Sequence, residues 1–502
     1  MTALYSIAQI RAIERAAYAE LAPGSLMQRA GQAACETALS LLGPTPDHAA
    51  VLVIAGPGNN GGDALILASL LASQGIAVTI LLHAHPQKYS AEAVEAYVQA
   101  KSSPARFINI NELSSMSWSL VVDGLFGIGL QRAIDEPLHS LIRHINGLPC
   151  PILALDVPSG LDADTGTIVG ESGIAVRATH TISFIADKPG LHTGLGRDHA
   201  GAVTVADLGI DSRHFTPPLA RLNSPSLFDS ILVPRLHNSH KGSYGDVVVI
   251  GGASGMGGAV LLSSRAALYC GAGRVLAGFL EQAPAYDVMH PEVMCRAADS
   301  ITLDNATLVV GPGLGTSDAA RSLLEAALCS PSPLVMDADA LNLVAATESY
   351  ADLLMRRSAP AILTPHPLEA ARLLGISSAE VQADRLKSAA AIASRFRCVT
   401  ILKGSGTVIA HPEGRLAVNP TGNPGLAAPG SGDVLAGLAG ALLSQHKLTW
   451  DTALAAVWLH GKAADELVRE GSGPAGLTAG ELAPQVRYLL NRLIAEHEVR
   501  GD

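Results

Sequence analysis

The stretch Gly422-Asn-Pro-Gly-Leu-Ala-Ala-Pro-Gly-Ser-Gly-Asp-Val-Leu-Ala-Gly437 is rich in Gly and Pro up to Asp433. Directly behind this part, residues 434–443 form an uninterrupted run of small and apolar residues, the pattern of a buried helix. A Gly-Ser-Gly turn that opens such a helix presents unpaired backbone N–H groups and the positive end of the helix dipole. The stretch therefore predicts an anion site, and phosphate is the expected occupant.

Asp433 lies in the first turn of this predicted helix, where the dipole favours its ionised form. A carboxylate beside phosphate oxygens would be repelled unless it has a task. Accepting a proton from a substrate hydroxyl is such a task. The alternative is that Ser431 and Asp433 only cap a helix after a flexible loop.

The composition predicts a large, well-buried globular protein. The chain has 502 residues, which is enough for two or three domains. Hydrophobic residues make up 48% and charged residues 16%, while 50 glycines and 4% aromatic residues are typical of α/β folds with tight turns. A formal net charge of −11 argues against nucleic acid or an anionic membrane as the partner.

The six cysteines are scattered without short spacings, which argues against a zinc site or a disulfide framework. No apolar run is long enough to span a bilayer, and the amphipathic N-terminus does not resemble a secretory signal. We therefore expect a cytoplasmic protein with small-molecule substrates, and we also expect a homo-oligomer.

The first half of the chain begins with a predicted βαβ unit. Residues 50–54 form an apolar strand, residues 56–63 a glycine loop, residues 64–73 a helix and residues 76–82 the next strand. This order predicts a Rossmann-like parallel sheet.

The glycine loop satisfies G-x-G-x-x-G, but it does not predict a conventional hydride-transfer site. No acidic residue follows the second strand to hold a ribose, and Pro57 lacks the amide that should donate there. Asn59, Asn60 and Asp63 are more informative, since amides and a carboxylate suit a polar ligand or a hard cation.

Two further strands of this half end in an aspartate. Asp123 follows an apolar strand and precedes a glycine loop, while Asp156 follows another strand and Ser159 comes shortly after it. Carboxyl ends of parallel strands converge on one crevice, so these residues predict a shared site. The alternative is that each aspartate is a helix cap or a turn residue.

The motifs Asn59-Asn-Gly-Gly-Asp63, Asp123-Gly-Leu-Phe-Gly-Ile-Gly129 and Asp156-Val-Pro-Ser-Gly-Leu-Asp162 resemble the NAD(P)H-hydrate epimerase domain. The resemblance implies that K⁺ is bound by Asn60, Asp123 and Ser159, and Asp156 is the candidate acid–base residue. Lys188 also matches a family pattern, without an assigned role. The residues implied to bind the hydrated dinucleotide are Asn59, Asn60, Gly61, Gly62, Asp63, Gly127, Ile128, Gly129, Leu130 and Asp156.

A boundary between two domains is predicted near residue 220. Residues 210–235 hold four prolines and no sustained periodicity, which indicates an interdomain linker. The predicted domains are residues 1–220 and 221–502.

The second half alternates strand-like and helical segments. Its predicted strands, at 246–250, 308–310, 334–336, 362–363 and 400–402, all end in glycine or polar residues, so a second crevice is expected at the strand ends. The loop that follows the first of them lacks the Lys-Ser/Thr ending of a P-loop, which excludes Walker chemistry.

Lys403-Gly, Gly422-Asn-Pro-Gly and Gly430-Ser-Gly-Asp433 resemble the ribokinase-type fold of small-molecule kinases. Together with His240-Lys-Gly-Ser-Tyr-Gly245, Val310-Gly-Pro-Gly-Leu-Gly315 and Thr364-Pro-His-Pro-Leu-Glu369, they are similar to the nucleotide-dependent NAD(P)H-hydrate dehydratases. This resemblance implies a reaction that uses ADP with Mg²⁺ and gives AMP and phosphate. It implies that Asp433 is the catalytic base, that Gly313, His366 and Asp433 bind the hydrate, and that Lys403, Gly404, Ser405, Gly406, Thr407 and Gly432 bind the nucleotide.

The two resemblances together imply a two-domain α/β enzyme that repairs hydrated NADH and NADPH. The first domain would interconvert the R and S epimers, and the second would dehydrate the S form. One alternative makes the first domain a binding or sensing module, and another makes the chain a vitamin-precursor or sugar kinase.

Two further predictions concern single positions of the second half. Glu369 either caps a helix or holds a magnesium-linked water. The run 454–460, which ends at His460, is predicted to be core.

Overall fold

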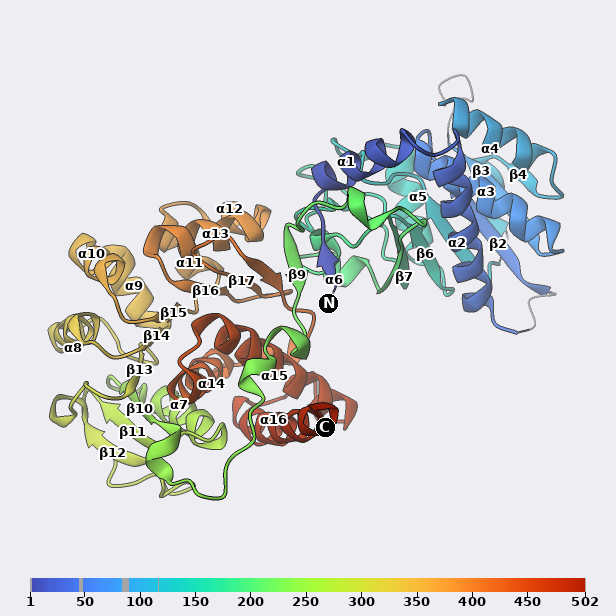
Figure 1. Ribbon diagram of the computed structural model, residues 1–502. Coiled ribbons are helices and arrows are strands. Elements are labelled where there is room, and N and C mark those ends of the chain that lie inside the picture. Colours follow the sequence, from blue (N-terminus) through green and yellow to red (C-terminus); the bar gives the residue numbers. More distant parts are fainter. Residues whose placement is uncertain (1, 45–47, 84–89, 116, 502) are drawn as a thin grey trace. The chain divides into compact units, whose positions relative to one another are not determined.

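The computed structural model describes residues 2–44, 48–83, 90–115 and 117–501, and it divides into two compact units (Figure 1). The first unit is Thr2–Ala220 and the second is Arg221–Asp502. The division falls where the loss of sequence periodicity places the boundary. Each unit has its own sheet and its own hydrophobic core.

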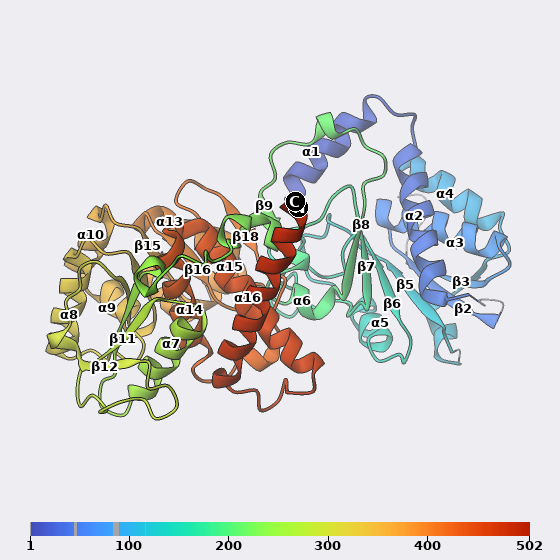
Figure 2. The same ribbon diagram turned by 60° about the horizontal axis from the view of Figure 1, so that its bottom comes forward.

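The first unit is built on a sheet in which every described pair of strands is parallel (Figure 2). The strand order is β4-β3-β2-β5-β6-β7-β8. The strand β2 therefore lies inside the sheet, with β3 and β4 added on one side and β5 to β8 on the other. This is the Rossmann-like arrangement that the sequence predicts. The strands are β2 (Ala50–Ala55), β3 (Ala77–Leu82), β4 (Arg106–Ile108), β5 (Leu120–Gly124), β6 (Ile152–Leu155), β7 (His180–Phe184) and β8 (Ala202–Ala206).

Helices cover both faces of this sheet because successive strand residues point to opposite sides. Val51 and Val53 pack into a core shared with the helices α1, α2, α3 and α4, whereas Leu52 and Ile54 pack with α5. Since both sets are apolar, the strand reads as a continuous hydrophobic run. The helices are α1 (Ile7–Tyr18), α2 (Ser25–Leu42), α3 (Asn59–Ser73), α4 (Ala91–Lys101) and α5 (Leu138–Ile145).

The helix α3 begins earlier than the sequence predicts. The expected start at residue 64 is wrong, because the helix already begins at Asn59. The two glycines of the first turn are packing residues and do not break the helix. A Cβ on Gly61 would lie 2.0 Å from the carbonyl oxygen of Gly56, so only glycine allows the turn to fold back on the preceding loop.

The second unit contains a mixed sheet in the order β9-β18-β17-β16-β15-β14-β13-β10-β11-β12. Its strands are parallel from β16 to β12, as the alternation of strands and helices predicts. The strands are β9 (Ala220–Leu222), β10 (Asp246–Gly251), β11 (Arg274–Phe279), β12 (Met294–Ala297), β13 (Thr307–Val310), β14 (Leu334–Met336), β15 (Ala361–Leu363), β16 (Val399–Leu402), β17 (Val408–Ala410) and β18 (Leu416–Val418).

Two details of this sheet were not predicted. The strand β17 pairs antiparallel with both β16 and β18, so residues 403–407 form the turn of a hairpin between β16 and β17. The predicted linker 210–235 is wrong in its second part, because β9 pairs with β18 and Phe228 and Ile231 are buried in the core. Pro225 starts a short 3₁₀ helix and a second one follows at Asp229–Ile231, and such short helices have no helical or strand periodicity to detect.

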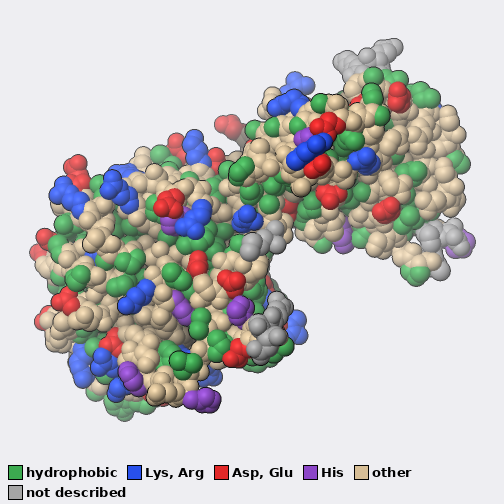
Figure 3. Space-filling model, in the orientation of Figure 1, with side chains coloured by type: hydrophobic (Ala, Val, Ile, Leu, Met, Phe, Trp, Pro, Cys, Tyr) green, Lys and Arg blue, Asp and Glu red, His purple; other side chains and the backbone are tan. Residues whose placement is uncertain are grey.

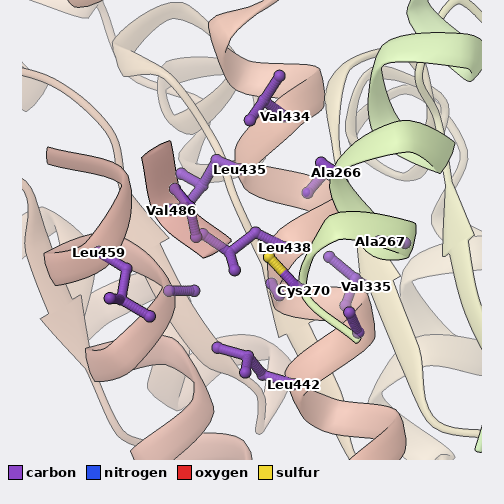
Figure 4. Packing of buried hydrophobic residues seen from close by; sticks show 14 of the residues in the cluster. Ala266, Ala267, Cys270, Val335, Val434, Leu435, Leu438, Leu442, Leu459 and Val486 are labelled. Atoms are coloured by element: carbon purple, nitrogen blue, oxygen red, sulfur yellow. The ribbon is translucent and has the colours of Figure 1, made fainter. Parts of the chain in front are cut away.

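The core of the second unit is centred on α14 (Ser431–His446), the helix predicted from its apolar run. Figure 4 shows Leu435, Leu438 and Leu442 of α14 facing side chains of neighbouring helices. The predicted core run 454–460 is confirmed, since it lies buried in α15. The helices of the unit are α7 (Gly257–Tyr269), α8 (Asp318–Cys329), α9 (Ala338–Ala346), α10 (Glu348–Arg356), α11 (Pro367–Leu374), α12 (Ser378–Ala383), α13 (Arg385–Phe396), α14, α15 (Thr449–Arg469) and α16 (Ala479–Gly501).

The surface carries no one-sided charge on the face that Figure 3 shows, where acidic and basic side chains are interspersed. Within the described ranges, no helix is long and apolar enough to cross a membrane.

The contact between α14 and α7 requires glycine at position 437, where an added Cβ would lie 2.0 Å from the carbonyl oxygen of Ser263. We expect Gly437→Ala to destabilise the second unit by about 1–3 kcal/mol, the usual result of overpacking a close-packed core. Gly480→Ala is the matched control, because its Cβ would meet nothing within 4 Å. Chemical denaturation of both variants would measure the difference, and equal midpoints would contradict the packing argument.

Candidate functional site

The helix α14 supplies one wall of a polar site at the strand ends of the second unit. Gly430 precedes the helix in the left-handed conformation, with φ of 87°, and Ser431 is tied back by a hydrogen bond from its hydroxyl to the carbonyl of Leu426. The ring of His460 lies 2.9 Å from the carbonyl of Ser431. Burial lowers the pKa of His460 to about 4, so the neutral ring donates through Nε2 and fixes this turn.

The predicted residues Gly432 and Lys403 come together at this helix start. A Cβ on Gly432 would lie 3.3 Å from Nζ of Lys403 and 3.7 Å from Oδ2 of Asp337. Lys403 follows β16 and pairs with Asp337 at the end of β14, with Nζ 2.5 Å from Oδ1. Thr364, after β15, donates to the same Oδ1 at 2.8 Å. Three adjacent strand ends and one helix start therefore surround a single ammonium group.

Asp433 is in the first turn of α14, as predicted, and its charge state depends on this cluster. Burial, together with the charge of Asp337, raises the pKa of Asp433 to about 6, and Lys403 opposes this shift. For Lys403 itself, burial favours the neutral form, but Asp337 and Glu369 outweigh burial and raise its pKa. The site thus holds a charged lysine beside a carboxylate that ionises near neutral pH.

His366 and Glu369 form a reciprocal cap at the start of α11. Nδ1 of His366 accepts from the backbone N–H of Leu368 at 3.1 Å, so the ring proton is on Nε2, which faces Oε1 of Glu369 at 3.2 Å. Glu369 also accepts from the backbone N–H of His366 at 2.8 Å. Burial raises the pKa of Glu369 to about 7. Of the two predicted roles of Glu369, the structure shows the capping one.

The predicted nucleotide residues Lys403, Gly404, Ser405, Gly406 and Thr407 make up the hairpin turn between β16 and β17. Gly404 and Gly406 have positive φ values of 139° and 60°. Beneath the turn lies the buried guanidinium of Arg385, which donates to the carbonyls of Leu402 and Lys403 at 3.2 Å. The turn is therefore held in shape from below.

Gly313 is a turn glycine, with φ of 57°, and its Cα faces Met256 so closely that a Cβ would lie 2.7 Å from that side chain. Its neighbour Gly315 donates its N–H to Asp339 at 2.8 Å. The turn role of Gly313 is thus shown, and its role in binding the hydrate stays a prediction.

The first unit contains a cavity of about 850 Å³. Its walls come from the first turn of α3, the loop after β5, the ends of β6 and β7, and the helices α1 and α2. Most of the predicted dinucleotide residues line it. They are Asn59, Asn60, Asp63, Gly127, Ile128, Gly129, Leu130 and Asp156.

Gly61 and Gly62 do not line this cavity. Both face inward, because a Cβ on Gly62 would lie 2.6 Å from the side chain of Met27 and one on Gly61 would meet the loop at Gly56. Their structural role is to bring the first turn of α3 close to its neighbours.

Asp156 lies at the cavity with its carboxylate held on one side. Its Oδ1 is 2.8 Å from Nζ of Lys188, a side chain with no exposed surface. Its Oδ2 lies 3.4 Å from the backbone N–H of Ile128. The nearby Asp63 is buried at the same cavity, and burial together with the charge of Asp156 raises its pKa.

The predicted potassium ligands Asp123 and Ser159 are in direct contact. The hydroxyl of Ser159 donates to Oδ1 of Asp123 at 2.6 Å, and its backbone N–H donates to Oδ2 at 2.8 Å. Burial raises the pKa of Asp123 to about 6, although these hydrogen bonds oppose the shift. The third predicted ligand, Asn60, is buried with neither side-chain atom hydrogen-bonded.

Sequence reasoning missed several residues of both sites. Asp337 ends a predicted strand, and its pairing with Lys403 could have been considered from that position alone. Glu14 and Tyr18 of α1 line the first cavity, but no motif marks them, since their helix reads as an ordinary amphipathic one. Among the described residues, no three His, Cys, Asp or Glu side chains are grouped so that they could hold a metal ion.

Comparison with known proteins assigns both units. Residues 247–485 match the family model described as NAD(P)H-hydrate dehydratase, and residues 23–190 match the model of the YjeF-related protein N-terminus. The bifunctional NAD(P)H-hydrate repair enzyme Nnr of Coxiella burnetii is 40% identical over 98% of this chain and 100% of its own length. The chain belongs to the family of bifunctional NAD(P)H-hydrate repair enzymes. The predicted family, with its epimerase and dehydratase activities, is confirmed.

A second member of the family supports this assignment, and one solved structure is similar to part of the chain. The repair enzyme of Escherichia coli is 39% identical over 93% of this chain and 89% of its own length. The ADP/ATP-dependent NAD(P)H-hydrate dehydratase from Bacillus subtilis, co-crystallised with ATP and Mg²⁺, is 29% identical. It covers 55% of this chain and 99% of its own, with a TM-score of 0.48.

The dehydratase site should respond to pH through Asp433, because a base with a pKa of about 6 is ionised above that pH and protonated below it. We expect dehydration to decline below about pH 6. In Lys403→Met the decline should begin at a higher pH, because the lysine lowers the pKa of Asp433. Rates at saturating nucleotide across the pH range would test this, with the exposed Lys387→Met as control. An unshifted profile in Lys403→Met would contradict the assignment.

Proposed function

We propose that the second domain dehydrates the S epimer of NAD(P)H hydrate with ADP and that the first domain interconverts the R and S epimers. The observation that carries the proposal for the second domain is the meeting of Asp433, Lys403 and Gly432 at the start of α14. A helix start and a buried lysine bind phosphate, while a carboxylate that ionises near pH 6 accepts a proton.

In the proposed dehydration, Asp433 takes the proton of the hydrate's hydroxyl group. The hydroxyl oxygen then attacks the β-phosphorus of ADP, and AMP leaves. Loss of the new phosphate group from carbon, with a proton from the neighbouring carbon, restores the double bond of the reduced nicotinamide. The hydrate would lie against Gly313 and His366, and the nucleotide against Lys403, the turn up to Thr407 and Gly432.

Mg²⁺ with ADP is part of the proposal. Asp337 and Asp433 both lie near Lys403, and carboxylate oxygens are the donors that this ion prefers, so these two would hold it together with the phosphates of ADP. When bound, Mg²⁺ would neutralise phosphate charge as the phosphoryl group is transferred.

In the first domain, we propose that the hydrated nicotinamide dinucleotide occupies the cavity lined by Asn59, Asp63 and the loop from Gly127 to Leu130. Asp156 is the proposed acid–base residue. The size of the cavity, the buried carboxylate of Asp63 and the partly buried carboxylate of Asp156 support this assignment.

The absorbance band of reduced nicotinamide tests both reactions in one experiment. The protein is mixed with both epimers of NADH hydrate, Mg²⁺ and ADP. We expect full recovery of the band in the wild type. We expect no enzymatic recovery in Asp433→Asn, in which epimerisation should persist because its site is in the other domain.

The remaining outcomes separate the alternatives. Recovery of only the S fraction, after spontaneous epimerisation is subtracted, would make the first domain a binding module. No recovery with ADP or ATP, or phosphate that stays on a stable alcohol, would favour a kinase. Dehydration by Asp433→Asn at the wild-type rate would refute its role as the base.

K⁺ is proposed to bind between Asn60, Asp123 and Ser159. The fit rests on Asn60, whose buried amide oxygen has no hydrogen-bond partner among the described residues, and on the buried carboxylate of Asp123, which accepts only from the neutral groups of Ser159 and Leu125 in that part of the chain. A hard cation would satisfy the oxygen and balance the charge. When bound, it would fix the loop after β5 against the first turn of α3.

Asp123→Ala should therefore weaken the response of epimerisation to K⁺. We expect the K⁺ concentration for half-maximal activity to rise about tenfold or more, because the charged ligand is lost. Titration with KCl at constant ionic strength, with choline chloride as the replacement salt, measures this. An unchanged titration would remove the ion from the proposal.

We also propose a cytoplasmic homo-oligomer. The described cysteines are all free thiols, which suits a reducing compartment. Light scattering of the purified protein would give the oligomeric state, and cell fractionation would give the compartment.

A further inference from the structure

The side chain of Lys188 is enclosed by acceptors and has no exposed surface. Its ammonium lies 2.8 Å from Oδ1 of Asp156 and donates to the hydroxyl of Ser183 at 2.7 Å. It also donates to the carbonyl oxygens of Phe184 at 3.0 Å and Ala186 at 3.1 Å. Four acceptors thus use the three protons of the ammonium group. Lys188 does not line the cavity, so it has no means of touching a substrate there.

The two turns that Lys188 contacts each contain a residue in an unusual backbone conformation. Asp156 has φ of 66° and Ile185 has φ of 71°, in the left-handed region that residues with a Cβ seldom adopt. For the β-branched Ile185 this is a genuine outlier. Such conformations persist only where the surroundings enforce them, and they cluster at functional sites. Both residues line the cavity, and the ammonium joins the two strained turns directly.

The ion pair with Lys188 also gives the two carboxylate oxygens of Asp156 different surroundings. Oδ1 of Asp156 contacts the ammonium at 2.8 Å and the backbone N–H of Phe184 at 3.4 Å. Oδ2 points to the loop after β5, where its contact with the N–H of Ile128 is 3.4 Å long and where Gly127 leaves open space. A Cβ on Gly127 would lie 3.0 Å from Oδ2.

We propose that Lys188 is a positioning residue of the epimerase, which holds Asp156 by Oδ1 and leaves Oδ2 free to exchange a proton with the substrate. This inference rests on the proposed function of the first domain and on Asp156 as its acid–base residue. Lys188 acts through Asp156 alone, and it makes no contact with the hydrate.

The test uses the full chain with the R epimer of NADH hydrate, Mg²⁺ and saturating ADP. Each S molecule that the first domain forms is then converted by the second domain to NADH, which is read by absorbance. The rate with the S epimer in the same preparation measures the second domain alone. It should be unchanged by any variant of the first domain.

In Lys188→Met we expect kcat from the R epimer to fall about 100-fold or more, the usual contribution of a positioned acid–base group. KM should stay within about threefold, because the residues that contact the substrate remain. The exposed Lys101→Met is the control and should match the wild type.

A double variant separates positioning from general structural damage. If Lys188 acts through Asp156, then Asp156→Asn combined with Lys188→Met loses no more kcat than Asp156→Asn alone. A further large loss in the double variant, or a Lys188→Met variant with wild-type kcat, would overturn the inference.

Lys188→Gln keeps the test valid should Lys188→Met fail to fold, because its amide can still donate to the carbonyl oxygens that the ammonium contacts. The charge that holds Oδ1 of Asp156 is lost in this variant, so kcat should fall with KM unchanged. Wild-type kcat in this variant would overturn the inference. A wild-type protein that does not convert the R epimer would overturn the proposed function instead.

Discussion

The close approach of α14 to its neighbours is the constraint on which the dehydratase site depends. Glycine at 437 lets the helix backbone touch that of α7, and glycine at 440 makes room for Val309 of the sheet. The helix can therefore lie directly over the strands, and its first turn reaches their carboxyl ends. Only in this position does Gly432 face Lys403 at the end of β16 and Asp337 at the end of β14. Bulkier residues would lift the anion site away from the lysine.

The two domains have different folds within the α/β class, yet both sites pair a lysine, fully buried in the first and partly buried in the second, with an aspartate at a strand end. In the first unit Lys188 contacts Asp156, the proposed acid–base residue, whereas in the second unit Lys403 contacts Asp337, which is near the proposed base Asp433. A buried charge is tolerated only when it is paired and hydrogen-bonded. The two lysines differ in how much of the side chain is left to contact a ligand. Lys188 has no remaining surface for a ligand, whereas Lys403 keeps part of its side chain exposed to the site.

Much of this arrangement could be predicted from the sequence, because it follows from local patterns. The apolar run behind Asp433 predicted α14. A crevice at the strand ends was predicted from the aspartates of the first half and from the glycine or polar residues of the second, since parallel strands bring their ends together. The rest depends on contacts between distant segments. The role of Lys188 needs a turn with positive φ at Ile185, a residue type that gives no sign of it. Glu14 and Tyr18 line the first cavity from a helix whose sequence indicates only amphipathicity.

The anion sites also explain how a chain with a net charge of −11 can bind polyphosphates. No basic patch is needed, since acidic and basic side chains are interspersed on the face in Figure 3. Attraction comes from groups inside the sites, namely the start of α14 and the ammonium of Lys403, where low polarity strengthens each interaction. The same low polarity raises the pKa of Asp433 to about 6. If the lysine were absent, the ionised carboxylate of Asp433 would repel phosphate. In the proposed mechanism the lysine therefore serves two purposes, because it would attract the nucleotide and it lowers the pKa of the neighbouring Asp433, which favours the ionised form that a base needs.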